Sequence, residues 1–139
     1  WAGLVTGEVL VSTEDTMGAV ALDGDLTAIA AAVAERASSS WRTAGVLDAM
    51  HATPFGELPG EVVVLFPIVD ALAHAWDLSA SVGRPIEFDP AELPWIAEVF
   101  QATCTDAARD HGLIAPPTPL PADATPTEEL LALAGRVTR

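Results

Sequence analysis

The sequence predicts an all-α protein, and three observations lead to that prediction. Apolar residues recur at helical spacing in several segments, helix-start signals precede those segments, and little of the chain alternates as a half-buried strand would. The chain has 139 residues, half of them hydrophobic, which is enough for a single domain over residues 1–139 with its own core. We therefore expect three or four helices joined by loops and packed as a bundle.

The first half of the chain is expected to contain one complete helix. Residues 1–7 have the composition of a helix tail, and residues 8–25 show no sustained period and are expected to form a loop. Asp25 is an N-cap candidate for the next helix, and Gly45 is its natural end. Residues 45–60 are rich in proline and glycine, so we expect a turn-rich connector there.

A long apolar helix is expected next, ending at Gly83. Because proline is tolerated only near a helix start, Pro67 predicts one of two arrangements. Either the helix begins near Phe66, with residues 61–66 extended, or it kinks there. The segment is otherwise apolar around most of its circumference, which is typical of a buried helix.

Capping signals place the last two helices. Asp89 opens a start signal, but Pro94 delays the regular helix to Leu93, and Gly112 ends it. Residues 113–126 contain five prolines and are expected to form a stiff, extended strap lying on the bundle. Thr125 and Glu128 then form a capping pattern for a short terminal helix.

The charge of the chain disfavours two classes of partner. Twenty acidic residues against six arginines give a net charge of −14, which repels phosphate, so we expect neither nucleic-acid nor membrane binding. No apolar run approaches the roughly 18 residues of a membrane span. The single cysteine, Cys104, cannot form an internal disulfide and is expected to be a buried, inert thiol in a reducing compartment. We therefore expect a soluble, cytoplasmic protein.

The candidate site lies in the long apolar helix, where Asp70, His74, Asp77 and Ser81 fall on one helical stripe. Two interpretations remain open. The stripe is either the solvent-facing side of an amphipathic helix, or it faces inward and binds a divalent metal. Imidazole and carboxylate are both ligands of zinc and similar ions. The apolar surroundings favour the inward orientation, because a buried helix offers no inexpensive place for an unpaired Asp and His.

Three segments carry a resemblance to a known family. HAWDLSASVGRP (residues 74–85), PFGELPG (54–60) and PADATPTEELLALAGR (121–136) occur in this order. Together they resemble the DinB-like family that includes the N-terminal metal-binding domain of the actinobacterial mycothiol-dependent maleylpyruvate isomerases, and in particular an uncharacterised metal-binding branch of that family. The resemblance implies a DinB-like four-helix bundle that holds one divalent metal, usually zinc.

The resemblance also implies roles for individual residues. The family's Glu-x-x-x-His pair matches Asp70 and His74 as metal ligands, with aspartate in place of the more frequent glutamate. Asp77 matches an acidic residue that supports a ligand or anchors the helix end. A further ligand, a histidine of an early helix, would lie upstream of Trp1, so the bundle is expected to lack its first helix or helices.

The function implied by the resemblance is that of a thiol-dependent isomerase or transferase. Metal-activated mycothiol would attack a small electrophilic substrate. The alternative is a non-catalytic bundle that serves in dimerisation or regulation, as a homodimer with a vestigial metal position. A metal-free pocket at Trp76 and Trp95 is a third hypothesis, although tryptophans at helical spacing are more often core residues. His51 and His111 are expected to have no role in chemistry.

Overall fold

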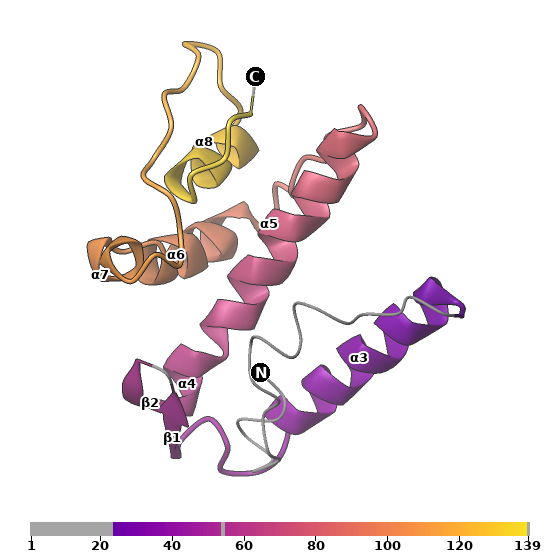
Figure 1. Ribbon diagram of the computed structural model, residues 1–139, viewed down its shortest axis with the longest axis vertical. Coiled ribbons are helices and arrows are strands. Elements are labelled where there is room, and N and C mark those ends of the chain that lie inside the picture. The colour runs from indigo at the N-terminus through magenta and orange to yellow at the C-terminus, as the bar shows by residue number, and fades with distance from the viewer. Residues whose placement is uncertain (1–23, 54, 139) are drawn as a thin grey trace. The chain divides into compact units, whose positions relative to one another are not determined.

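The computed structural model describes residues 24–53 and 55–138 (Figure 1). The predictions for residues 1–7 and 8–23 fall outside these described residues. About 54% of the described residues are helical, and a small antiparallel sheet accompanies the helices. The all-α prediction is therefore wrong. The described chain has a mixed fold, with helices and a β-hairpin, and is not an all-α four-helix bundle.

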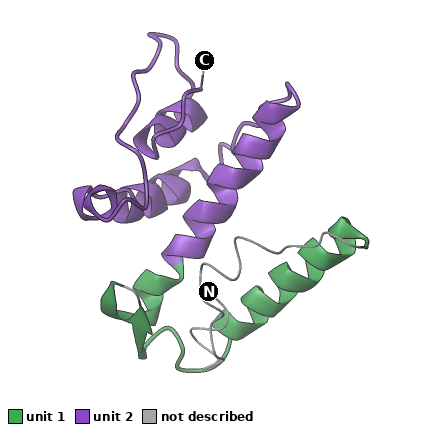
Figure 2. Cartoon of the chain, viewed as in Figure 1, with its two compact units in different colours: residues 1–64 green, residues 65–139 purple. Residues whose placement is uncertain are grey.

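The chain divides into two compact units, residues 1–64 and residues 65–139 (Figure 2). In the first unit, α3 spans Leu26–Trp41. Asp25 caps it as predicted, since its carboxylate accepts from the backbone N–H groups of Thr27 and Ala28. The helix ends at Trp41, before Gly45, and serines, which are weak helix formers, lie near its end. The Ser40 hydroxyl, for example, donates to the Arg36 carbonyl at 2.8 Å.

The predicted connector contains a β-hairpin. Strand β1 (Met50–Thr53) pairs antiparallel with β2 (Gly56–Pro59), in a register that sets Met50 opposite Pro59 and Thr53 opposite Gly56. The Thr53 hydroxyl donates to the Gly56 carbonyl at 2.7 Å and closes the turn. The prolines and glycines in this stretch indicated loop structure, but here they bound two short strands.

The segment after the hairpin is helical and not extended. Helix α4 (Gly60–Val63) belongs to the first unit, and α5 (Leu65–Ser81) opens the second. The helix is interrupted at Val64, and Pro67 explains the position, because its ring would clash with the carbonyl of Val63 four residues earlier. Helix α5 begins at Leu65, close to the predicted start near Phe66, but the residues before it form α4 and are not extended. Helix α5 ends as predicted, with Gly83 at a φ of 71°.

The core of the second unit lies among α5, α6 (Leu93–Thr103) and α8 (Pro126–Leu133). Its buried residues are Trp76, Phe88, Ile96, Phe100, Cys104, Leu131 and Ala134. The rings of Phe88 and Phe100 lie 6.2 Å apart between centroids. The backbone N–H of Phe88 donates to the Thr127 hydroxyl at 2.9 Å, which joins the segment before α6 to α8.

The boundaries of the last helices follow their capping signals. Helix α6 begins at Leu93 as expected, but it ends at Thr103, and a separate α7 (Asp106–Asp110) follows with Thr105 as its N-cap. Residues 115–121 lack helix and strand, as predicted for the strap. Thr125 and Glu128 form the predicted capping box at the start of α8.

One stretch of the described chain, Gly60–Ser81, is long and apolar enough to cross a membrane by length and composition alone, and it is 17% buried. A single stretch of this kind is weak evidence for a membrane span. Asp70, His74 and Asp77 interrupt its apolar surface, and the chain carries a net charge of −14. These features are consistent with a soluble protein.

Candidate functional site

The predicted stripe on α5 exists as a ladder of polar contacts. The Nε2 atom of His74 lies 3.3 Å from Oδ1 of Asp70, one turn earlier. Its Nδ1 atom lies 3.0 Å from Oδ2 of Asp77, one turn later. Each ring nitrogen therefore faces a carboxylate, and helical spacing brings the three side chains together as the sequence indicated. Ser81 is separate, since its hydroxyl donates to the Leu78 carbonyl at 2.7 Å.

A fourth residue, Arg136, extends the ladder from the segment after α8. Its Nη2 and Nε atoms donate to the two carboxylate oxygens of Asp77 at 3.2 and 3.4 Å. Its Nη1 atom donates to the Ala134 carbonyl at 3.0 Å. Arg136 is not among the residues predicted for the site, because 59 residues separate it from Asp77 along the chain. Its position beside Gly135, a helix-terminating glycine, was the only local signal.

The turn at Gly135 directs Arg136 toward α5. Gly135 has a φ of 80°, and the backbone N–H of Arg136 returns to the Leu131 carbonyl at 2.9 Å, as in a Schellman motif. A Cβ at this glycine would lie 2.6 Å from Cβ of Ala115 and 2.9 Å from its carbonyl oxygen. Glycine is therefore required here by both conformation and space.

The ladder lies at the surface of its unit. The side chains of Asp70 and His74 are 62% and 61% exposed, whereas those of Asp77 and Arg136 are 37% and 23% exposed. Helix α5 buries only Ala73 and Trp76 among the described residues. The expected inward orientation of the stripe is therefore wrong for Asp70 and His74, which face solvent, and only its Asp77 end, beside Arg136, is partly protected.

The charges around Asp77 alter its acidity. Partial burial would raise the pKa of the Asp77 carboxyl, but the hydrogen bonds and charges of Arg136 and His74 outweigh that effect. The pKa of Asp77 is therefore held below its ordinary value of 3.8. Asp77 is thus anionic near neutral pH, when it accepts from both the guanidinium and the imidazole.

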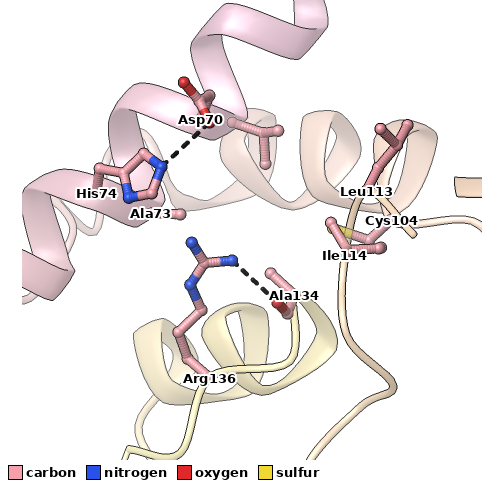
Figure 3. A pocket seen from close by; sticks show the side chains of 9 residues that line it. Asp70, Ala73, His74, Cys104, Leu113, Ile114, Ala134 and Arg136 are labelled. Carbon is pink, nitrogen blue, oxygen red and sulfur yellow. Dashed lines mark hydrogen bonds and ion pairs between the residues drawn. The ribbon is translucent and has the colours of Figure 1, made fainter. Parts of the chain in front are cut away.

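A hollow of about 160 Å³ lies beside the ladder (Figure 3). Its apolar wall consists of Val69, Ala73, Leu113, Ile114 and Ala134. Asp70, His74, Arg136 and Cys104 complete the lining. Figure 3 shows the guanidinium of Arg136 pointing from the segment after α8 toward the helix that carries Asp70 and His74. The second unit thus brings an imidazole, a carboxylate and a guanidinium to one small concavity.

The pair formed by Asp70 and His74 has the bite of a metal chelate. Two ligands that each lie about 2.0–2.1 Å from a tetrahedral ion are separated by about 3.3–3.4 Å, and the observed separation of Oδ1 and Nε2 is 3.3 Å. Asp77 accepts from the other ring nitrogen, which is the usual support of a metal-bound histidine. A direct ion pair between the two side chains has the same separation, so the distance by itself does not distinguish a metal chelate from a salt bridge. Within residues 24–53 and 55–138, no three His, Cys, Asp or Glu side chains form a cluster that could hold one.

The remaining candidates lie elsewhere. His51 Nε2 contacts the Val46 carbonyl at 2.7 Å, and His111 caps the C-terminus of α7. Trp76 is a core residue and Trp95 is 47% exposed, so the two tryptophans do not line the hollow. Cys104 is free and buried, and burial raises the pKa of its thiol. It is a neutral part of the wall at physiological pH.

Comparisons with known proteins find relatives but no assigned function. Two uncharacterized proteins of Mycobacterium tuberculosis, Rv0738 of strain H37Rv and MT0763 of strain CDC 1551, are each 31% identical to this chain over 115 residues. The match covers 82% of this chain and 63% of each relative, so the chain spans less than two thirds of the length of these relatives. No family model matches the chain. No solved structure matches it either.

Proposed function

We propose that this protein binds one divalent metal through Asp70 and His74 and acts as a thiol-dependent isomerase or transferase. The observation that carries the proposal is the 3.3 Å separation of the two donor atoms at the edge of the hollow. The resemblance of the sequence to the DinB-like metal-binding family supports it. That resemblance also makes zinc the first candidate for the metal and mycothiol the first candidate for the thiol.

The residues of the chain would perform complementary tasks. Asp77 accepts from Nδ1 of His74, which leaves the lone pair of Nε2 on the side of Asp70, where a ligand atom is needed. Arg136 holds Asp77 in place through two contacts. A bound divalent ion would supply Lewis acidity that favours the thiolate form of a small thiol cosubstrate. The apolar wall of the hollow would receive the carbon frame of an electrophilic substrate.

Two features of the chain support a cytoplasmic location. Cys104 is buried as a free thiol, and no other cysteine exists to pair with it. The net charge of −14 favours solubility in this compartment.

The alternative is a non-catalytic module that forms homodimers or regulates a partner, with a vestigial metal position. The observation that favours it is the exposure of Leu78 and Val82, at 71% and 70%, near the end of α5. A module of this kind would bind metal weakly through two donors. Sedimentation equilibrium of the purified chain, with and without zinc, measures the dimerisation that this alternative requires.

Metal analysis tests the main proposal. The full chain, purified without chelator and dialysed against equimolar zinc, is expected to retain close to one metal per chain by elemental analysis. Asp70→Ala and His74→Ala should each lose it, because a single remaining ligand cannot chelate. His111→Ala is the matched control, since it removes an imidazole outside the hollow. Equal, low metal in the wild type and all variants would refute the proposal.

A further inference from the structure

Helix α5 presents three different faces in the second unit. One face packs against the core that it shares with α6 and α8, and these two helices lie to one side of α5 (Figure 2). The residues of this face are Val69, Leu72, Ala73, Trp76 and Ala80. The ladder of Asp70, His74 and Asp77 forms the second face. The third face, which we call the α5 stripe, consists of apolar residues and ends just after the helix: Ile68, Ala71, Ala75, Leu78 and Val82.

The α5 stripe has the spacing of a coiled-coil seam. Its residues recur at intervals of three, four, three and four positions. Leu78 and Val82 are 71% and 70% exposed, Ala71 and Ala75 are exposed, and Ile68 is partly buried. The two alanines in the middle allow a second helix to approach closely, because the distance between packed helices depends on the side chains at their contact. The stripe therefore matches the apolar face of another helix.

The area of the α5 stripe limits what can cover it stably. Helix α5 has 17 residues and is therefore about 25 Å long, and one face about 10 Å wide covers roughly a few hundred square ångströms. Each partner in an interface of standard size buries about 800 Å². A second helix that relies on apolar contact alone would consequently bind weakly, so its charge decides which partner is stable.

The charge of the chain distinguishes the possible partners. The second unit has eleven acidic residues and four arginines, which gives a net charge of −7, and the sequence of α5 contains two aspartates and neither lysine nor arginine. The chain as a whole carries −14. A second copy of the chain would therefore meet like charge. A helix with lysine or arginine beside its apolar face would meet opposite charge.

We propose that the α5 stripe is a docking site for a basic amphipathic helix of another protein. The apolar side chains of that helix would cover Leu78 and Val82, and its lysines or arginines would face the acidic surface of the second unit. This inference deepens the regulatory alternative and rests on it. It is independent of the metal chemistry, because it uses no atom of Asp70 or His74. A face of this size suits a transient partner, whose binding weakens as salt screens the charges.

The test uses the full chain, kept in chelator, and a synthetic helical peptide of three heptads as the probe. This basic peptide has leucine at its a and d positions and lysine at its e and g positions, so that it does not pair with itself. One control peptide has glutamate in place of every lysine, and another has alanine in place of every leucine. Fluorescence anisotropy of the labelled peptides gives dissociation constants at low and high salt.

Three variants of the chain locate the binding. Leu78→Gln and Ala75→Gln alter the α5 stripe without a change of charge. Val137→Gln is the matched control, since Val137 is 74% exposed in the same unit but outside α5. Circular dichroism establishes that each variant folds, which we expect because the three substituted residues are exposed.

The basic peptide should bind the wild type at low salt, and both control peptides should bind more weakly. Leu78→Gln should weaken binding of the basic peptide by about tenfold, because covering a leucine side chain of this exposure is worth about a factor of ten. Ala75→Gln should also weaken it, because the longer side chain holds the two helices apart. Val137→Gln should bind the peptide as the wild type does, and high salt should weaken binding to both.

Three outcomes would overturn the inference. Equal affinity of the wild type and the two stripe variants would show that the peptide binds elsewhere. Equal affinity for the basic and the glutamate peptide would show that charge does not select the partner. Sedimentation equilibrium at high salt tests a second copy of the chain as the occupant. A wild-type dimer that Leu78→Gln abolishes would assign the stripe to self-association, which would keep the non-catalytic alternative and reject the basic partner.

Discussion

Replacing Asp77 with asparagine tests the ladder at its most connected point. The Asp77 carboxylate contacts Arg136 at 3.2 and 3.4 Å and His74 at 3.0 Å, and it links α5 to the segment after α8. Asparagine keeps the shape and one acceptor oxygen but removes the charge. Because the Asp77 side chain is 37% exposed, solvent screening reduces the worth of the ion pair. We expect Asp77→Asn to lower the free energy of unfolding by about 1 kcal/mol at pH 7.

The effect should depend on pH with a defined sign. The folded-state pKa of Asp77 is lowered, so its contribution is present above the ordinary value of 3.8 and is lost as pH falls through the lower folded-state value. Urea unfolding followed by circular dichroism, at several pH values between 7 and 3, gives the difference between wild type and variant. That difference should be largest at pH 7 and should shrink below about pH 4.

Glu98→Gln is the matched control for this experiment. It neutralises an exposed carboxylate on α6, in the same unit, away from the ladder. Its stability should follow that of the wild type at every pH. A difference between wild type and Asp77→Asn that stays constant into acid, or grows there, would contradict the role assigned to the Arg136 and Asp77 contact.

Three further predictions concern the second unit. Gly135→Ala should lower the free energy of unfolding by about 2–3 kcal/mol, because the backbone there is left-handed and the new Cβ would lie 2.6 Å from Cβ of Ala115. Gly112→Ala, at a φ of 71° but with open space around it, should lower it by only about 1 kcal/mol. Urea unfolding measures both. Thr125→Ala removes the capping box of α8 and should cost about 1 kcal/mol by the same assay, with Thr125→Ser largely unaffected. Cys104, buried and with its thiol pKa raised, should react with iodoacetamide only as fast as the unit opens, so mass spectrometry should show alkylation accelerated by sub-denaturing urea.

The sequence predicted the features of the fold that depend on local chemistry. Asp25, Thr125 and Gly83 each mark a helix end through a hydrogen bond or a backbone angle set by a few neighbouring residues. The hairpin was missed because its residues have weak strand propensity, and its pairing depends on contacts across the turn. Proline and glycine indicated where the chain changes direction there, without indicating that the flanking residues pair.

In the candidate site, too, the contacts within one helix were predictable and the contacts between distant segments were not. Helical periodicity sufficed to bring Asp70, His74 and Asp77 together, because all three lie on one helix. The contact of Arg136 with Asp77, and the hollow, could not be predicted in this way. Both depend on tertiary packing of α8 and the strap against α5, which brings distant parts of the sequence together. The expectation of a helix buried on most sides also exceeded what the structure shows, as Leu78 is 71% exposed. Burial depends on partners that a single segment does not specify.

The distance along the chain between Asp77 and Arg136 has a consequence for folding kinetics. During synthesis, α5 emerges with both carboxylates and the imidazole but without the guanidinium, which is made 59 residues later. Contacts of such long range form slowly, because a large loop must close before they stabilise anything. Until then Asp77 lacks its arginine partner, so cations in solution can bind to the carboxylates of the nascent helix before Arg136 is synthesised.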